Sequence, residues 1–513
     1  MKESRTNKLI KNTTTSLMEQ GVYTVMTFIC RTVFIYTLGK TYLGFSGLFN
    51  DILTLLSLAE LGVGTAILYS MYKPAAQNDY ETLGALLNLY KRVYHSIGVV
   101  ITILGLCLAP CLDFFISDIP EIPKLPVIYI LYLLNTTSSY FFVYKKSILI
   151  VTQRSYIASL IYIGLITLQN VLQIIFLLFT QNYIAYLIIQ VTCSLLNNIL
   201  ISIYVDNNYP ELVYYKNARL DKEATKEIFA NVRAMFLSKI SSAIVTSTDN
   251  LLISKFVSTI ILGLYSNYTL FVTMIRTIMT KIFQALVGSV GNLIALEDKE
   301  KVYSVFKKIW FVNFWIVAFM TTTLFTLVNS FIELWIGETY ILEMEIVFVV
   351  CFNLYMRLIR NTFITFIDAF GLFKELKLKC IAEAIINLVV SLVFVLPLEM
   401  GIYGVLLGTI VSNLATNFWY EPYLLFCKKF GVSFIEYMKY FAKYFIVTTV
   451  GATVVFYISN YLLVIQGWGG FILKGIICCL FLNLFYFVVF RKSEEFDYVL
   501  SLIVGRIKRK HHQ

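Results

Sequence analysis

The sequence predicts an all-α polytopic membrane protein with about fourteen transmembrane helices, arranged as two six-helix lobes in a parallel pseudo-two-fold repeat plus two extra C-terminal helices. Its composition, its apolar runs and an internal repeat each predict part of this fold. The chain has 513 residues, of which 58% are hydrophobic and 14% charged, and its mean hydropathy is +0.75. Soluble domains carry about 25% charged residues, so this composition is typical of an integral membrane protein.

Continuous apolar runs of about twenty residues, long enough to cross a bilayer as a helix, recur along the whole chain. The N-terminal segment lacks the short apolar core and small-residue cleavage site of a secretory signal peptide, so we expect the first run to stay in the membrane. The fourteen expected spans are 17–38, 44–72, 90–112, 126–149, 157–179, 183–204, 230–256, 259–285, 309–330, 341–367, 378–397, 401–425, 441–463 and 468–490.

The charges in the connections alternate with the expected spans. Most of the 42 lysines and arginines fall in the termini and the even-numbered connections, whereas the odd-numbered connections hold only Lys40, Lys124 and Lys255. By the positive-inside rule, both termini are predicted to be cytoplasmic. The net charge of +11 therefore reflects cytoplasmic loops, and we expect no nucleic-acid partner.

Several other classes of function find no support in the sequence. The connections are short, so we expect no soluble catalytic domain and no enzyme activity. The nine cysteines fall mostly inside apolar runs without metal-ligand spacing, so we expect neither a disulfide framework nor a metal site. A phosphate-binding Gly-Lys-Ser/Thr loop is missing from the sequence, so we expect no ATP hydrolysis and no cofactor. Coupling to an ion gradient stays open.

Two stretches recur at a nearly constant offset. "TYLGFSGLF" at 41–49 matches "IILGLYSNY" at 260–268 with an offset of 219, and "SLLNN" at 194–198 matches "SNLATN" at 412–417. Six spans per repeat is an even number, so the two repeats should share one orientation about an axis along the membrane normal. We therefore expect an N-lobe at 1–218 (spans one to six) and a C-lobe at 219–435 (spans seven to twelve), with spans thirteen and fourteen and a basic cytoplasmic tail at 436–513.

Three basic residues inside the expected spans are candidates for binding an anionic substrate. Arg31, within "FICRTVFIYTLGK" at 28–40, lies about 10 Å below the outer end of span one. Arg276 lies in the inner half of span eight and Lys281 near its inner end. A charge inside a membrane marks a functional site by default, and arginine binds phosphate oxygens with a planar pair of donors. The alternatives are structural ion pairs and side chains that reach toward the interface.

Three acidic residues are candidates for gating or for pairing with these cations. Asp51 on span two and Asp249 on span seven are expected at the depth of Arg31, and Glu60 is expected near the middle of the membrane. With an offset of 219, Asp249 is also close to the repeat equivalent of Arg31. A purely structural pairing role is the alternative for each.

The segment "RTVFIYTLGKTYLGFSGLFNDILTLLSLAELGVGTAILYSMYKPAAQND" at 31–79 resembles the first hairpin of bacterial polysaccharide-repeat-unit flippases, which belong to the multidrug/oligosaccharidyl-lipid/polysaccharide exporter superfamily. The similarity lies in the span-one arginine, the Leu-Gly turn, the Glu60-Leu61-Gly62 motif and the small-residue run that ends near a tyrosine and a lysine. Over the rest of the chain it depends on the span order and the lobe repeat.

The resemblance implies a flippase of the bacterial plasma (inner) membrane. Such a protein moves undecaprenyl-diphosphate-linked oligosaccharide repeat units from the cytoplasmic to the outer leaflet by alternating access, for capsule or surface polysaccharide export. Its implied partners are that lipid-linked oligosaccharide, the membrane lipids, a polysaccharide polymerase and glycosyltransferases. A peptidoglycan-precursor flippase and a drug or cation antiporter of the same superfamily are the alternatives. The antiporter is expected to have an acid-rich cavity because its substrates are cations.

Overall fold

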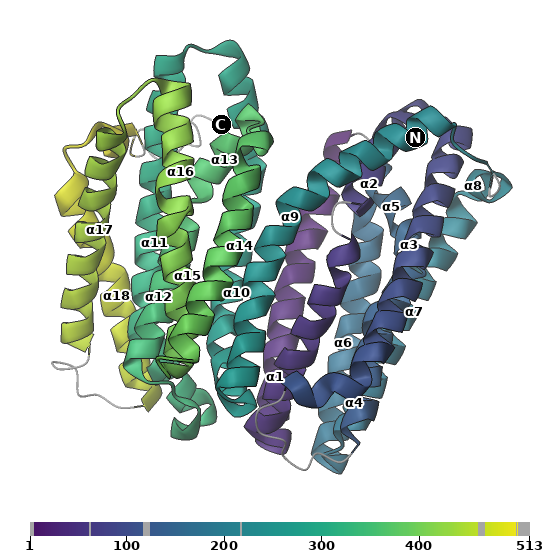
Figure 1. The fold of residues 1–513 in the computed structure, drawn as a ribbon, viewed down its shortest axis with the longest axis horizontal. Coiled ribbons are helices and arrows are strands. Elements are labelled where there is room, and N and C mark those ends of the chain that lie inside the picture. Colours follow the sequence, from purple (N-terminus) through teal and green to yellow (C-terminus); the bar gives the residue numbers. More distant parts are fainter. Residues whose placement is uncertain are drawn as a thin grey trace. The chain divides into compact units, whose positions relative to one another are not determined.

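The computed structural model describes residues 5–60, 63–115, 124–215, 218–459, 467–498 and 500. Within these residues the regular structure is helical, and no strand occurs (Figure 1). The chain forms two compact units, Met1–Gly263 and Leu264–Gln513. These units are defined by contacts in space, whereas the expected lobe limits come from the internal repeat of the sequence. The lobe limits therefore stay predictions, at 1–218, 219–435 and 436–513.

The first unit consists of long helices joined by short connections. In chain order these are α1 (Arg5–Leu56), η1 (Ser57–Glu60), α2 (Val63–Gln77), α3 (Tyr80–Leu108), η2 (Ala109–Phe115), α4 (Leu125–Tyr140), α5 (Val143–Val151), α6 (Ser155–Thr180), α7 (Tyr183–Asn208), α8 (Pro210–Tyr214) and α9 (Lys222–Phe256). The next helix, α10 (Thr259–Leu296), begins in the first unit and continues in the second.

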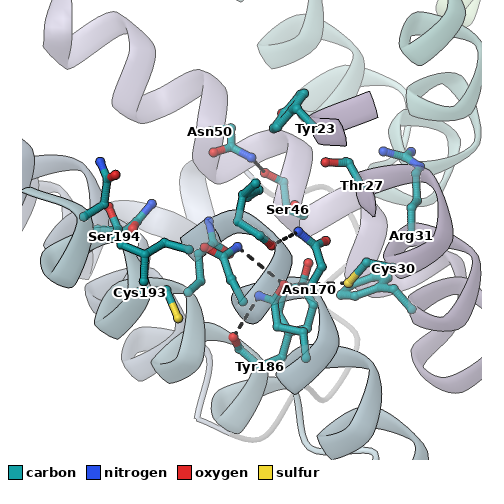
Figure 2. Close-up of a pocket in the computed structure, with 18 of the residues that line it drawn as sticks. Tyr23, Thr27, Cys30, Arg31, Ser46, Asn50, Asn170, Tyr186, Cys193 and Ser194 are labelled. Atoms are coloured by element: carbon teal, nitrogen blue, oxygen red, sulfur yellow. Dashed lines mark hydrogen bonds between the residues drawn. The ribbon is translucent and has the colours of Figure 1, made fainter. Parts of the chain in front are cut away.

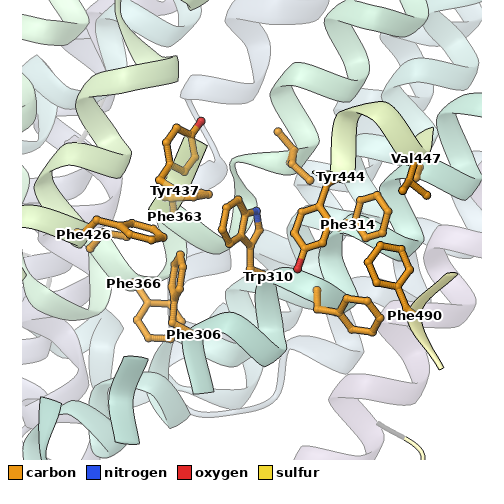
Figure 3. Packing of buried hydrophobic residues seen from close by; sticks show 14 of the residues in the cluster. Phe306, Trp310, Phe314, Phe363, Phe366, Phe426, Tyr437, Tyr444, Val447 and Phe490 are labelled. Atoms are coloured by element: carbon orange, nitrogen blue, oxygen red, sulfur yellow. The ribbon is translucent and has the colours of Figure 1, made fainter. Parts of the chain in front are cut away.

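The second unit continues with α11 (Lys299–Ile336), η3 (Glu338–Tyr340), α12 (Met344–Ile359), α13 (Asn361–Phe370), α14 (Phe373–Val395), α15 (Gly401–Ala415), α16 (Asn417–Tyr423), the π-helical turn η4 (Leu424–Phe430), α17 (Phe434–Tyr457) and α18 (Gly467–Phe490). Its core is a cluster of aromatic side chains centred on Trp310 of α11 (Figure 3). Phe314 of α11 stacks on Tyr444 of α17 with ring centroids 4.2 Å apart. Phe490 of α18 also lies against Phe314, with ring centroids 5.4 Å apart, so the two C-terminal helices pack on α11.

The prediction of an all-helical polytopic membrane protein is confirmed, and the described residues of each expected span lie largely in helices. Eleven helices in the described part of the chain are long and apolar enough to cross a membrane, or twelve if the bent pair α4 and α5 forms one span. The sequence predicted about fourteen spans. The numbers differ because spans one and two share the long α1, and because α9, which contains many serine, threonine and charged residues, is not among the eleven.

Helix α1 is broken at Gly39, where φ is 79° and ψ is −175°. This combination is open only to glycine, because a Cβ atom would clash with the backbone. The break divides α1 into an N-terminal arm before Gly39 and a C-terminal arm after it. It falls between the expected limits of span one, which ends at 38, and span two, which begins at 44.

Candidate substrate cavity

A cavity of about 390 Å³ lies inside the first unit, between α1, α4, α6 and α7 (Figure 2). Ligand pockets in proteins usually measure about 300–1,000 Å³, so this cavity is large enough for a small polar group. Seven carboxamide side chains line it: Asn50, Asn135, Gln169, Asn170, Gln173, Gln190 and Asn197. Four tyrosines also contribute: Tyr23, Tyr132, Tyr162 and Tyr186.

Both arms of α1 contribute one face to this cavity. Tyr23, Thr27 and Arg31 follow each other at intervals of four on the N-terminal arm, and Ser46 and Asn50 have the same spacing on the C-terminal arm. Residues four apart lie on one face of a helix. Because both faces line the same cavity, the break at Gly39 is what brings the two arms together around it.

The opposite wall comes from α6 and α7. On α6 the lining residues run from Tyr162 to Gln173, and on α7 from Tyr186 to Asn197, again at helical intervals. Figure 2 shows Arg31 and Thr27 at one side of the cavity and Cys193 and Ser194 at the other. A ligand in the cavity would therefore contact the arginine on one side and α7 on the other.

Arg31 is the only charged residue among the described residues that line the cavity. Its side chain is half-buried. The other polar lining groups are neutral amides and hydroxyls. The described lining residues therefore place a positive charge at one side of the cavity and offer no carboxylate to a cationic ligand.

Part of the wall is held by hydrogen bonds within the protein. The Tyr132 hydroxyl donates to Ser46 Oγ at 2.8 Å and lies 2.7 Å from the hydroxyl of Tyr183. Gln173 Nε2 donates to the Tyr186 carbonyl at 3.2 Å, and Gln173 Oε1 accepts from Cys30 Sγ at 3.7 Å. These bonds join α1, α4, α6 and α7 around the cavity.

The three acidic candidates lie elsewhere in the first unit. Asp51 Oδ2, on the C-terminal arm of α1, accepts a hydrogen bond from Asn250 Nδ2 of α9 at 2.8 Å. Asp249 is half-buried beside Asn250 on α9. Glu60 Oε1 accepts from the Tyr94 hydroxyl of α3 at 2.7 Å. None of the three acids is a lining residue of the cavity, and their gating role stays a prediction.

The other two cationic candidates belong to α10 in the second unit. Arg276 is half-buried and Lys281 is exposed. Neither side chain lines the cavity of the first unit. The prediction that Arg31, Arg276 and Lys281 act on one substrate therefore stays a prediction.

The second unit contains a buried charge cluster whose pairing the sequence did not predict. Arg360, at the junction of α12 and α13, donates from Nε and from its terminal nitrogen to the two oxygens of Glu421, at 3.0 and 2.6 Å. Lys379 Nζ bonds Glu421 at 3.0 Å and lies 3.4 Å from Glu383. Asn417 bonds both Lys379 and Glu383. The two acids balance the two bases, as is typical of a structural charge cluster.

A metal centre finds no support in the described part of the chain, where no group of three or more His, Cys, Asp or Glu side chains could hold a metal ion. The described helices thus contain a polar cavity with Arg31 as the one charged residue of its described lining, and a cluster in which two acids balance two bases.

No family model matches the sequence, and no curated protein matches it either. Solved structures do match. An inward-facing multidrug resistance MATE family transporter of the MOP superfamily is 14% identical, covering 76% of this chain and 91% of that chain, with a TM-score of 0.61. An outward-facing MATE family transporter of that superfamily is 13% identical, covering 80% and 92%, with a TM-score of 0.55.

The lipid II flippase MurJ, in an inward closed conformation, is 15% identical and covers 91% of this chain and 98% of that chain, with a TM-score of 0.62. At these identities the likeness shows the fold. The protein is a multi-pass membrane protein with the fold shared by the MATE transporters and MurJ.

Proposed function

We propose that this protein is a flippase that moves undecaprenyl-diphosphate-linked oligosaccharide repeat units from the cytoplasmic to the outer leaflet of the bacterial plasma membrane. It works by alternating access, both termini are cytoplasmic, and the product feeds surface polysaccharide synthesis. The single observation that carries the proposal is the cavity in which Arg31 is the one charged residue among the described lining residues.

The chemistry of this cavity suits a diphosphate joined to a saccharide. A guanidinium stays charged at all physiological pH values and binds two phosphate oxygens at once. The amides and hydroxyls around it suit the donors and acceptors of a sugar. A cationic drug would meet a positive charge and no carboxylate among the described lining residues, which disfavours the antiporter alternative.

The peptidoglycan-precursor alternative shares the lipid diphosphate, and MurJ is matched over nearly its whole length. Deletion or depletion of the gene should have different effects on the cell for the two kinds of flippase. Deleting the gene should remove surface polysaccharide while growth continues if the repeat unit is the substrate. Lysis on depletion, with surface polysaccharide unchanged beforehand, would instead assign the peptidoglycan precursor.

The proposed flippase acts between enzymes on the two sides of the membrane. Glycosyltransferases would assemble its substrate at the cytoplasmic face, and a polymerase would consume it at the outer face. The transporter itself performs no covalent chemistry. A direct test is the binding of purified protein in nanodiscs to undecaprenyl diphosphate without sugar. Arg31-dependent binding is expected, and equal binding by Arg31→Ala would reject the proposed role of the cavity.

A further inference from the structure

One stripe of α7 presents polar side chains that make no hydrogen bond within the described part of the protein. Gln190, Ser194 and Asn197 line the cavity at intervals of four and three, so they lie on one helical face. All three are half-buried. None donates to or accepts from another described residue through its side chain. We call these three residues the α7 stripe.

Other polar residues of α6 and α7 do make hydrogen bonds within the protein, outside the cavity and, for Asn170, in its lining. Thr192 of α7 donates to the carbonyl of Ile188 at 2.8 Å, and Thr167 of α6 donates to that of Ile163. Asn170 of α6 donates to the Ile166 carbonyl at 2.7 Å. In an apolar environment, such side chains usually donate a hydrogen bond to a backbone carbonyl of the preceding helical turn. The side chains of the α7 stripe line the cavity and have no such hydrogen bond among the described residues.

Asn135 of α4 is a fourth cavity-lining side chain, and the third amide, without a hydrogen bond to another described residue. Its Oδ1 and that of Asn197 are buried and accept no hydrogen bond from the described residues. Both oxygens are covered by protein in this conformation, although both residues line the cavity. A buried acceptor without a partner destabilises the protein, so a ligand that donates a hydrogen bond to these amides would recover that free energy.

The charge of the wall limits which ligand fits it. A carboxylate can only accept hydrogen bonds, and it needs a cation to offset its desolvation. The described lining residues supply one cation, Arg31, which lies on the side of the cavity away from Ser194 (Figure 2). Under the proposed function, the guanidinium of Arg31 already binds the diphosphate. An acidic sugar against α7 would therefore have no partner for its charge among the described residues.

We infer that the α7 stripe, together with Asn135, is the subsite for an uncharged saccharide group, which binds through its hydroxyl or amide groups while its diphosphate lies toward Arg31. This inference rests on the proposed function and deepens it. It assigns specificity for neutral over acidic sugars to Gln190, Ser194 and Asn197.

The test uses the full chain in nanodiscs and three probes: undecaprenyl diphosphate, the same lipid carrying one N-acetylglucosamine, and the same lipid carrying one glucuronic acid. Dissociation constants are measured by microscale thermophoresis. Each neutral hydrogen bond contributes about 1 kcal/mol, so the N-acetylglucosamine probe should bind about fivefold to tenfold tighter than the bare lipid. The glucuronic acid probe should show no such gain.

A triple variant, Gln190→Leu, Ser194→Ala and Asn197→Leu, should lose the gain from the neutral sugar while it keeps the affinity for the bare lipid. Thr192→Ala is the matched control, because Thr192 lies on the same helix, is exposed and bonds its own backbone. It should retain the gain. The single variant Ser194→Ala serves if the triple variant does not fold, and it should show part of the loss.

The outcomes separate the inference from the proposed function. Equal affinity of the wild-type protein for the neutral and acidic probes would overturn the subsite, as would a full sugar-dependent gain in the folded α7 variants. Failure of the wild-type protein to bind the bare lipid through Arg31 would overturn the proposed function instead.

Discussion

Gly44 and Gly263, which are equivalent positions of the internal repeat, meet backbone to backbone within the first compact unit. A Cβ atom placed on Gly263 would lie 2.4 Å from the carbonyl oxygen of Lys40 and 3.0 Å from the amide nitrogen of Gly44. A Cβ on Gly44 would lie 2.1 Å from the carbonyl oxygen of Thr259. Small residues let helices approach this closely in membrane proteins. The Leu-Gly pairs of the repeat therefore mark a contact between the C-terminal arm of α1 and the start of α10.

We expect Gly263→Ala to destabilise the protein, because its Cβ would strike backbone atoms that cannot move without shifting a helix. Overpacking of this kind costs roughly 1–3 kcal/mol. The measurement is the thermal unfolding midpoint of the purified protein in detergent. Gly291→Ala is the control, since Gly291 lies on the same helix and a Cβ atom there would meet nothing within 4 Å. An unchanged midpoint for Gly263→Ala would mean that the contact is not close in solution.

Gly39 is expected to tolerate no side chain, for a different reason. Apart from the local backbone, a Cβ there would meet nothing within 4 Å, but φ of 79° with ψ of −175° is strained for any other residue. Gly39→Ala should cost roughly 1–3 kcal/mol and should displace the two arms of α1 that line the cavity. Substrate binding should therefore weaken along with stability. Gly21→Ala, on the N-terminal arm with open space around it, should leave both measurements unchanged.

Arg31→Ala should abolish surface polysaccharide export in a complemented deletion strain while the protein still inserts at wild-type level. Arg31→Lys should restore export only in part, because an ammonium keeps the charge but loses the planar pair of donors. Export is measured by surface polysaccharide immunoblot, and protein level by membrane immunoblot. Full export by the alanine variant would exclude Arg31 from substrate binding.

We expect Glu421 to stabilise the folded protein. Its carboxylate is 2% exposed and accepts from Arg360 and Lys379, so Glu421→Gln would leave the half-buried Arg360 and the buried Lys379 with one remaining acid, Glu383. Removing one partner of a buried ion pair costs roughly 3–5 kcal/mol. Glu297→Gln tests an exposed pair with Lys301 and should cost at most about 1 kcal/mol. Unfolding midpoints of the two variants that fall by the same amount would contradict this assignment.

The sequence predicted much of the fold because a membrane span leaves a strong local signal. Continuous apolar runs located most of the long helices, and the turn around Gly39 marked the break in α1. A charge within an apolar run also stands out, which is why Arg31 could be predicted as a candidate. The seven Asn and Gln side chains that line the cavity were not predicted, because a neutral amide every three or four residues does not stand out from an apolar run as a charge does. Which helical faces meet is decided by tertiary packing.

The second pair of repeated stretches shows that similar residues can have different roles, which the sequence alone does not distinguish. "SLLNN" supplies Ser194 and Asn197 to the cavity in the first unit. Its counterpart "SNLATN" supplies Asn413 and Asn417, which bond Arg360, Lys379 and Glu383 in the second unit. In one unit the side chains of Ser194 and Asn197 make no hydrogen bond to another described residue, and in the other the amides bond charged residues from distant parts of the sequence. Local pattern alone does not reveal that difference.

The hydrogen bond from Asn250 to Asp51 joins α9 to the C-terminal arm of α1, and we expect it to act as part of a gate on the outer side. Both side chains are half-buried, so Asn250→Leu would leave the carboxylate without this donor and would weaken the contact between the two helices. Opening should then be more frequent when no substrate is present.

A reporter cysteine tests this expectation. Ser46→Cys, on the C-terminal arm of α1 and in the cavity wall, is introduced into a variant in which the nine native cysteines are replaced. Its rate of reaction with a membrane-impermeant maleimide added from outside is then measured in cells. The rate should rise severalfold in Asn250→Leu and stay unchanged in Asn208→Leu, a substitution at an exposed position near the end of α7. Equal rates at equal protein levels would mean that the bond between Asn250 and Asp51 is structural, because a gate held by it would open more often once the donor is lost.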